Sequence, residues 1–317
     1  MLAAGLPMAV PLEGLPAEVR IHEVGARDGL QNEKSTVPTE VKAEFIHRLA
    51  AAGLRTIEAT SFVHPRWVPQ LADAGDLMPL LAELAGREPD LRLPVLVPNE
   101  RGLERALALG VREIAVFGSA TESFARANLN RTVDESLAMF EPVVAKARAA
   151  GVQVRGYLSM CFGDPWEGPV PIAQVAGVAR HLHEMGCAEL SLGDTIGVAT
   201  PGHVTALLDE LTRHVPVARL AVHFHDTYGQ ALSNTLAALR RGVTVVDASA
   251  GGLGGCPYAK SATGNLATED LVWMLQGLGI RTGVDLGRLS ATSVWMAEHL
   301  GRPSPSRTVR ALTHEEQ

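Results

Sequence analysis

The sequence predicts an α/β protein in which eight strand–helix units close into a TIM (β/α)8 barrel, with an additional C-terminal helical segment. Short apolar runs alternate with amphipathic segments along almost the whole chain, as expected for parallel strands covered on both faces by helices. Glycines stand between several helices and the strands that follow them, where a helix commonly ends in a left-handed residue. An open doubly wound sheet is the alternative, but no GxGxxG pattern follows the first strand.

The expected strands are short apolar runs. In chain order they cover residues 19–24, 55–60, 91–97, 111–117, 152–160, 188–192, 219–225 and 243–249. Each is followed by a segment with apolar residues at helical spacing, over 39–54, 67–84, 99–110, 132–151, 170–186, 200–215, 230–242 and 265–279. The glycines expected to end helices are Gly53, Gly110, Gly151, Gly186 and Gly242. A further helical segment at 286–300 follows the eighth unit.

Three segments are expected in the 317-residue chain: a flexible N-terminal arm over 1–18, a TIM-barrel catalytic domain with its C-terminal helix over 19–300, and a C-terminal tail over 301–317. The first sixteen residues are apolar, but they contain three prolines, lack a basic region and are shorter than a membrane span. The hydrophobic fraction of 46% is ample for one barrel-sized core.

Charge and cysteine content exclude several classes of partner. The net charge is −7 and no run of five basic residues occurs, so neither nucleic acid nor an anionic membrane surface is expected as a partner. No stretch of about eighteen apolar residues predicts a membrane span. Three scattered cysteines are too few for a disulfide framework or a cysteine zinc site, which favours a reducing, cytoplasmic location.

Polar residues gather where the predicted strands end, which is the rim that carries the active site in a TIM barrel. They are Glu23, Arg27, Asp28, Glu58, Asn99, Asp194, His223, His225, Cys256, Lys260 and Asn265. Each has an ordinary alternative: Asn99 or Asp194 taken alone is more often a helix N-cap, and Cys256 alone more often a small buried side chain. Their convergence on one rim favours a functional site.

The pair His223 and His225 lies in the stretch HFHDTYGQ, at the end of the seventh strand. Side chains alternate along a strand, so the two imidazoles point the same way and can hold one ion. Taken alone, metal binding and ordinary hydrogen bonding are equally good interpretations of this pair. With a carboxylate and an amide oxygen nearby, the set suits Mg²⁺, Mn²⁺ or Zn²⁺ with positions left open for substrate oxygens.

Five segments resemble the signature segments of the 3-hydroxy-3-methylglutaryl-CoA lyase family, over about residues 19 to 300. They are EVGARDGLQNE (23–33), TSFVHPRWVPQ (60–70), GDTIGVATPG (193–202), HFHDTYGQALSN (223–234) and GGLGGCPYAKSATGNLATEDL (251–271). The RDG stretch and the His-x-His pair are shared with the wider superfamily of metal-dependent lyases and Claisen synthases, whereas the GGLGGCPYA loop is more specific to the lyases.

The resemblance implies cleavage of 3-hydroxy-3-methylglutaryl-CoA to acetyl-CoA and acetoacetate, in leucine degradation and ketone-body formation. It implies that Asp28, His223, His225 and Asn265 bind Mg²⁺ or Mn²⁺. It further implies that Arg27 holds the thioester carbonyl oxygen, that Cys256 is the catalytic thiol, and that Glu58 and Asp194 support the site. The chain also departs from the family at one point: some members carry a regulatory cysteine near the C-terminus, and the tail here has none.

Breaking the carbon–carbon bond of the substrate requires a base, a cation at the enolate oxygen and an acid, and these residues can supply all three. Asp28 or His223 could remove the proton of the tertiary alcohol, and Arg27 could stabilise the enolate oxygen of acetyl-CoA. A thiol such as Cys256, with an ordinary pKa of ~8.5, is mostly protonated at neutral pH and could protonate the enolate carbon. The expected partner is an acyl-CoA, and the family implies a homodimer; the lack of a basic, amphipathic targeting extension favours a cytoplasmic location. The alternatives are a lyase for a related 3-hydroxyacyl-CoA, a Claisen-type synthase, and a non-catalytic metal-binding barrel.

Overall fold

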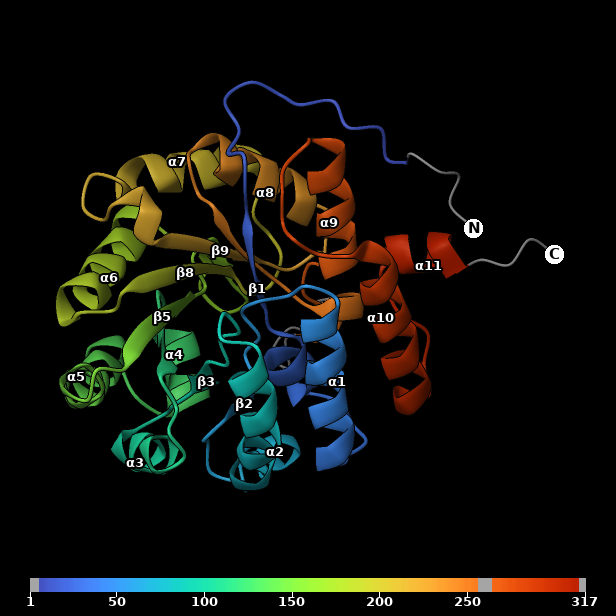
Figure 1. The fold of residues 1–317 in the computed structure, drawn as a ribbon. Helices are drawn as coiled ribbons and strands as arrows, with labels where there is room; N and C mark the ends of the chain where they lie inside the picture. Colours follow the sequence, from blue (N-terminus) through green and yellow to red (C-terminus); the bar gives the residue numbers. More distant parts are fainter. Residues whose placement is uncertain (1–5, 256–263, 314–317) are drawn as a thin grey trace.

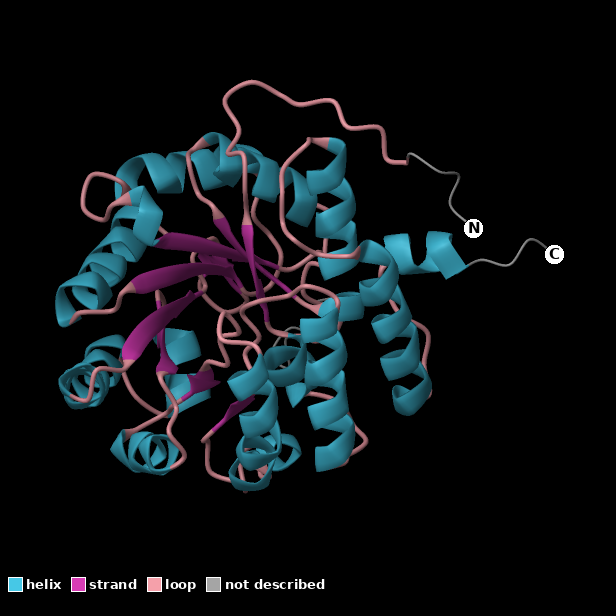
Figure 2. Ribbon diagram, in the orientation of Figure 1, coloured by secondary structure: helices cyan, strands magenta, loops and turns pink. Residues whose placement is uncertain are grey.

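The computed structural model, which describes residues 6–255 and 264–313, is a barrel of parallel strands surrounded by helices (Figures 1 and 2). The barrel strands are β1 (Arg20–Glu23), β2 (Thr60–Ser61), β3 (Val95–Leu96), β4 (Glu113–Ser119), β5 (Gln153–Ser159), β8 (Glu189–Asp194), β9 (Leu220–Phe224) and β10 (Val245–Ala248). They follow one another around the sheet in the order β1-β10-β9-β8-β5-β4-β3-β2. The predicted TIM-barrel fold is confirmed.

The two ends of this sheet meet, which closes the barrel. Glu23 on β1 pairs in parallel with Ile57, just before β2. The backbone N–H of Glu23 donates to the carbonyl of Thr56 at 2.9 Å, and the N–H of Glu58 donates to the carbonyl of Glu23 at 2.8 Å. The C-terminal ends of β1 and β2 are thereby placed side by side.

Helices cover the outer face of the sheet (Figure 2). They are α1 (Thr39–Ala51), α2 (Ala74–Arg87), α3 (Glu100–Ala108), α4 (Glu122–Leu129), α5 (Val133–Ala149), α6 (Ile172–Met185), α7 (Pro201–Leu211), α8 (Ala231–Arg240), α9 (Thr268–Gly277), α10 (Leu286–Leu300) and α11 (Arg307–Thr313). The apolar core fills the space between strands and helices, and side chains such as Phe45, Phe140 and Leu190 are fully buried there. Burying both faces of the strands explains why they appear in the sequence as continuous apolar runs.

The five glycines expected to end helices all adopt positive φ angles, between 71° and 109°. Two of them also have close neighbours. A Cβ atom at Gly53 would lie 2.2 Å from the carbonyl oxygen of Gly283, and one at Gly186 would lie 2.3 Å from Nη1 of Arg148. The obstacle at Gly53 is backbone, so sterics and backbone conformation together fix the end of α1 there. At Gly186 the obstacle is the end of a flexible side chain, so the positive φ angle alone favours glycine.

The regular parts of β2 and β3 are shorter than the sequence predicts. Pairing nevertheless extends through isolated contacts, because Ile57 donates its N–H to the carbonyl of Arg92 and Ala59 donates to that of Pro94. Pro94 has no N–H to return, so the ladder between the two strands is interrupted there. Helix α2 begins at Ala74 rather than at Trp67, after the short turn η2 (Pro69–Leu71).

Other segments were not expected from the sequence. Helix α4 lies in the predicted loop after β4, the two-stranded hairpin β6 (Gly163–Asp164) and β7 (Gly168–Pro169) follows β5, and α11 lies within the predicted tail. The predicted helix at 286–300 is confirmed as α10, whose N-cap Asp285 accepts a hydrogen bond from the N–H of Arg288 at 3.0 Å. Within residues 6–255 and 264–313, no helix has the length and apolarity needed to cross a bilayer.

Candidate metal centre and active site

The first strand ends in an unusual helical turn that carries two of the predicted site residues. Residues Gly25–Gly29 form the π-helix η1, in which Arg27 is buried and Asp28 is partly buried. Such turns occur frequently at functional sites because the widened turn changes the direction of the side chains. Glu23, at the end of β1, accepts hydrogen bonds from the N–H groups of Gly25 and Ala250, both at 2.8 Å, and therefore ties this turn to the start of the glycine-rich loop.

The seventh strand of the barrel places the two histidines beside Asp28. One nitrogen of His223, one nitrogen of His225 and one carboxylate oxygen of Asp28 all lie within 4.8 Å of one another. Asn265 joins them from beyond the glycine-rich loop, because it forms an isolated antiparallel bridge with His225. The four residues predicted as metal ligands are thus brought together from three distant parts of the sequence.

The chemistry of these side chains fits a divalent cation. Asn265 donates from Nδ2 to Oδ2 of Asp28 at 2.8 Å and to the carbonyl of Leu253 at 3.0 Å. Within the described part of the chain, its other amide atom, Oδ1, is buried and accepts no hydrogen bond. A buried acceptor without a donor is costly, and a cation held by two imidazoles, a carboxylate and this oxygen would satisfy it.

The charges around Asp28 favour its ionised form. Burial alone would raise the pKa of Asp28, but the neighbouring charges of Arg27, His223 and His225 and the hydrogen bond from Asn265 together lower it below its usual value. Burial alone would lower the pKa of His223, but the nearby carboxylates of Asp247 and Asp28 outweigh burial and raise the pKa of this imidazole. A carboxylate that remains ionised is what cation binding requires.

Arg27 is held as a fixed cation beside this cluster. Its Nη2 donates to Oε2 of Glu58 at 2.8 Å, and its Nη1 donates to Oδ1 of Asp28 at the same distance. Glu58 is fully buried and also accepts a hydrogen bond from the hydroxyl of Tyr157 at 2.8 Å. The guanidinium lies over the ring of Tyr157, 5.4 Å from its centre. Two carboxylates and one aromatic ring therefore orient a permanently charged planar group.

The remaining predicted site residues differ in the contacts that their side chains make. Asn99 is the N-cap of α3 and accepts the N–H of Gly102 at 2.9 Å, so its ordinary interpretation is confirmed. Asp194, at the end of β8, accepts from the N–H groups of Val198 and Ala199, and burial raises its pKa to about 6. Cys256 and Lys260 lie outside the described residues.

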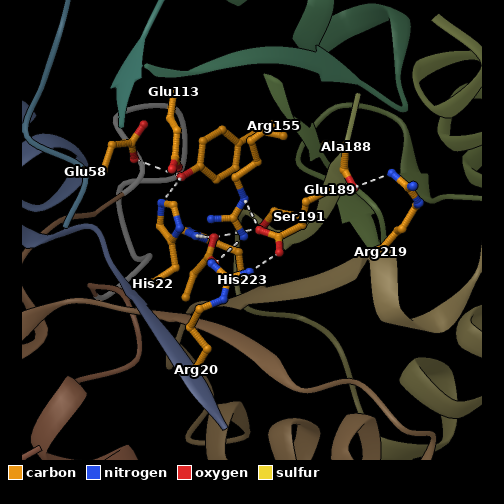
Figure 3. A network of polar contacts seen from close by, with 12 residues as sticks. Arg20, His22, Glu58, Glu113, Arg155, Ala188, Glu189, Ser191, Arg219 and His223 are labelled. Atoms are coloured by element: carbon orange, nitrogen blue, oxygen red, sulfur yellow. Dashed lines mark hydrogen bonds and ion pairs between the residues drawn. The ribbon is translucent and has the colours of Figure 1, made fainter. Parts of the chain in front are cut away.

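Several polar residues inside the barrel were not predicted. Figure 3 shows His22, Arg155, Ser191 and His223 converging in one network of polar contacts, and Tyr157 and Asp247 also belong to it. Arg155 pairs with Asp247, and this pair holds the pKa of Asp247 well below its usual range although burial opposes it. The available signal in the sequence was a charged or polar residue within each otherwise apolar strand run.

Comparison with known proteins identifies similar chains over most of the sequence. Residues 18–295 match the family model named HMGL-like. A mitochondrial hydroxymethylglutaryl-CoA lyase of Rattus norvegicus is 54% identical over 297 residues, which cover 94% of this chain and 90% of that protein. The corresponding Arabidopsis thaliana protein is 54% identical over 300 residues, and the match spans 95% of this chain but only 63% of that protein. A Rattus norvegicus relative that is 50% identical over 303 residues, 96% of this chain and 87% of that protein, is named cytoplasmic.

Solved structures give the same result. The crystal structure of hydroxymethylglutaryl-CoA lyase from Pseudomonas aeruginosa superposes with a TM-score of 0.91 at 48% identity, covering 94% of this chain and 98% of that one. An HMG-CoA lyase from Acinetobacter baumannii, solved in complex with coenzyme A and 3-methylmalate, superposes with a TM-score of 0.87 at 34% identity, covering 97% of this chain and 98% of that one.

Proposed function

The chain belongs to the HMGL-like family, and from this premise we propose that it cleaves 3-hydroxy-3-methylglutaryl-CoA into acetyl-CoA and acetoacetate. One observation supports this function above all others: Asp28 of the candidate metal cluster is hydrogen-bonded to Arg27, a buried guanidinium, on the same rim of the barrel. Carbon–carbon cleavage of a 3-hydroxyacyl thioester needs both a Lewis acid at the hydroxyl group and a cation at the developing enolate oxygen.

The family depends on a divalent metal, and we propose that Asp28, His223, His225 and Asn265 hold Mg²⁺ or Mn²⁺ in this chain. Among the described residues, no donor reaches Oδ1 of Asn265, and this buried oxygen and the mixed nitrogen and oxygen ligands support the assignment. When bound, the cation would make the tertiary hydroxyl of the substrate easier to deprotonate and would orient the substrate oxygens. Fewer ligands than a closed shell leave room for those oxygens.

Arg27 is assigned to the thioester carbonyl oxygen, where negative charge develops as the carbon–carbon bond breaks. The interactions with Glu58 and Asp28 fix the guanidinium before the reaction, so no reorganisation is needed when the charge appears. The proton of the tertiary hydroxyl passes to Asp28, because a His223 ring that holds the cation through one nitrogen keeps its proton on the other and has no lone pair left to accept one.

Cys256 is assigned to the last proton transfer, onto the carbon of the acetyl-CoA enolate. This thiol lies outside the described residues, so the assignment depends on the chemistry and on the resemblance of the GGLGGCPYA segment to that of the lyases. The root of the loop is described: Ala250 is bound to Glu23, and the N–H of Gly251 donates to Glu269 at 2.8 Å. Two buried glutamate carboxyl groups therefore anchor the chain where the loop begins.

An acyl-CoA is the substrate class, and a homodimer and a cytoplasmic location belong to the same proposal. The A. baumannii relative was solved with coenzyme A, which supports acyl-CoA binding on this fold. Relatives named both mitochondrial and cytoplasmic occur at similar identity, so the compartment is proposed from composition alone. The absence of basic runs in the sequence supports a small-molecule substrate over nucleic acid.

Product analysis tests this function against its alternatives. Purified protein supplied with hydroxymethylglutaryl-CoA and Mg²⁺ should release acetoacetate and acetyl-CoA in equal amounts, without free coenzyme A thiol. A Claisen-type synthase would instead consume acetyl-CoA with a 2-oxo acid and release free thiol, and a non-catalytic barrel would do neither. A lyase for a related substrate would cleave another 3-hydroxyacyl-CoA faster than the hydroxymethylglutaryl ester.

A further inference from the structure

Asp247 is a buried carboxylate on β10 that contacts one of the proposed metal ligands. Its Oδ2 lies 3.2 Å from Nδ1 of His223 and accepts a hydrogen bond from the hydroxyl of Ser191 at 2.8 Å. Its Oδ1 accepts from Nη2 of Arg155 at 2.6 Å. The side chain of Asp247 is fully buried, and that of Arg155 is 6% exposed. Three neighbouring groups from three other strands therefore contact this one carboxylate.

The register of the barrel fixes this contact. Asp247 on β10 pairs with His223 on β9, and on its other side it pairs with His22 on β1. Residues at the same level of adjacent parallel strands point to the same side of the sheet, here the barrel interior. The contact between Asp247 and His223 is thus imposed by backbone pairing and does not depend on a loop.

The arrangement determines which nitrogen of His223 carries the proton. The carboxylate of Asp247 is ionised opposite the permanently charged Arg155, so it can only accept hydrogen bonds. Nδ1 of His223 must then be the donor. The neutral ring has a single N–H, so Nε2 is left with its lone pair free for a cation.

We propose that Asp247 is a positioning residue of the metal centre, which holds His223 in the tautomer that presents Nε2 to a divalent cation. Arg155 keeps the carboxylate ionised and oriented toward His223, and the hydroxyl of Ser191 adds a hydrogen bond to Oδ2 that this task does not require. The inference rests on the proposed metal site and adds a residue that does not itself touch metal or substrate. Carboxylates behind metal-binding histidines typically change metal affinity by about 10- to 100-fold when they are removed.

The substitution Asp247→Asn tests the proposal because it places a hydrogen-bond donor instead of an acceptor opposite Nδ1 of His223, while the shape of the side chain hardly changes. Arg155 only donates, so the amide oxygen must face Arg155, and the NH₂ group then faces His223. A donor at that position holds the imidazole proton on Nε2, the nitrogen needed for the cation. We expect the affinity for Mn²⁺, measured by electron paramagnetic resonance titration, to fall by about 10- to 100-fold.

Ser191→Ala is the matched control. It removes the other donor to Oδ2 of Asp247 but leaves the carboxylate charge and its contact with His223. Asp247→Asn loses the negative charge opposite the buried Arg155 and Ser191→Ala loses a buried hydrogen bond, so both variants should melt at lower temperatures than the parent. If Asp247 serves only to stabilise the barrel, both variants will retain parental Mn²⁺ affinity as long as they are folded. The proposal predicts that only the asparagine variant loses affinity.

A spectroscopic measurement on the parent protein decides the question even if Asp247→Asn does not fold. In ¹⁵N-histidine-labelled, Mg²⁺-loaded protein, the resonances of His223 can be assigned by their loss in His223→Gln. The proposal predicts a proton on Nδ1 and none on Nε2. A proton on Nε2 overturns it.

The variant His225→Ala separates this inference from the metal site on which it rests. If His225→Ala binds Mn²⁺ as the parent does, the proposed metal site is wrong. If His225→Ala loses affinity while folded Asp247→Asn retains it, the site stands and the positioning role of Asp247 is overturned.

Discussion

Replacing Arg27 by lysine should separate the geometry of this residue from its charge. In the parent, two different nitrogens of the guanidinium contact Glu58 and Asp28, each at 2.8 Å. A lysine ammonium is a point charge on a flexible stem, and it cannot reproduce this planar fork. Arg27→Lys should therefore retain the positive charge at the rim but lose the fixed orientation.

The magnitude follows from the contacts that are lost. One of two charge-assisted hydrogen bonds disappears, each worth about 1.5–3 kcal/mol. In addition, the cation no longer sits at a fixed position opposite the developing enolate oxygen. Removal of one oxyanion contact in other enzymes lowers kcat by about 10²- to 10³-fold, so we expect a decrease of roughly 10² or more.

Steady-state kinetics with hydroxymethylglutaryl-CoA at saturating Mg²⁺ measure the effect, with kcat and KM reported separately. Arg20→Lys is the matched control, because Arg20 lies at the opposite end of β1 and pairs with Glu189 rather than with the site. It should keep parental kcat. If Arg27→Lys shows parental kcat and only a raised KM, Arg27 anchors the substrate and does not stabilise the transition state.

Three further predictions concern the metal, the thiol and a buried carboxylate. His225→Ala should bind Mn²⁺ far more weakly than the parent and lose most activity while its circular dichroism spectrum stays native; an unchanged Mn²⁺ titration would refute the ligand assignment. Cys256→Ser should lower kcat by about 10² to 10⁴ with unchanged metal content, because serine is a much weaker acid, and near-parental kcat would remove this thiol from the mechanism. Burial raises the pKa of Glu269 to about 8 from its usual 4.5, so the folded protein retains a proton that the unfolded chain releases. This carboxyl group therefore contributes stability that is present below pH 4.5 and lost as pH rises to about 8. The free energy of unfolding of Glu269→Gln, measured with urea, should fall less steeply with pH across this window than that of the parent. The same pH dependence in both proteins would contradict the raised pKa.

The architecture of the barrel could be predicted because it depends on patterns that are local in sequence. Apolar runs, helical spacing and glycine stops repeat in each unit, and the predicted helix at 286–300 coincides with α10. The clustering of Asp28, His223 and His225 was also predictable, since each of these residues follows or ends a strand and such ends share one rim. The interruption of β2 and β3 depended on a backbone detail at Pro94 that the apolar pattern does not show.

The residues inside the barrel could not be assigned in the same way. Asp247 and Arg155 stand alone within apolar strand runs, and their roles depend on the register between strands that are distant in sequence. Tyr157 has an apolar ring that suits a strand, and only its hydroxyl contact with Glu58 places it in the site. Asn99 illustrates the opposite case, because a residue at a strand end proved to be a helix cap.

The claim that a metal held at this rim drives the cleavage can be tested by one titration. Chelator-treated protein is supplied with hydroxymethylglutaryl-CoA, and acetoacetate formation is followed as Mn²⁺ is added, with bound Mn²⁺ measured in the same samples. We expect negligible turnover without metal and a rate that rises in proportion to bound Mn²⁺ until one ion per chain is reached. Full turnover in the metal-free protein, or a rate unrelated to bound Mn²⁺, would contradict it.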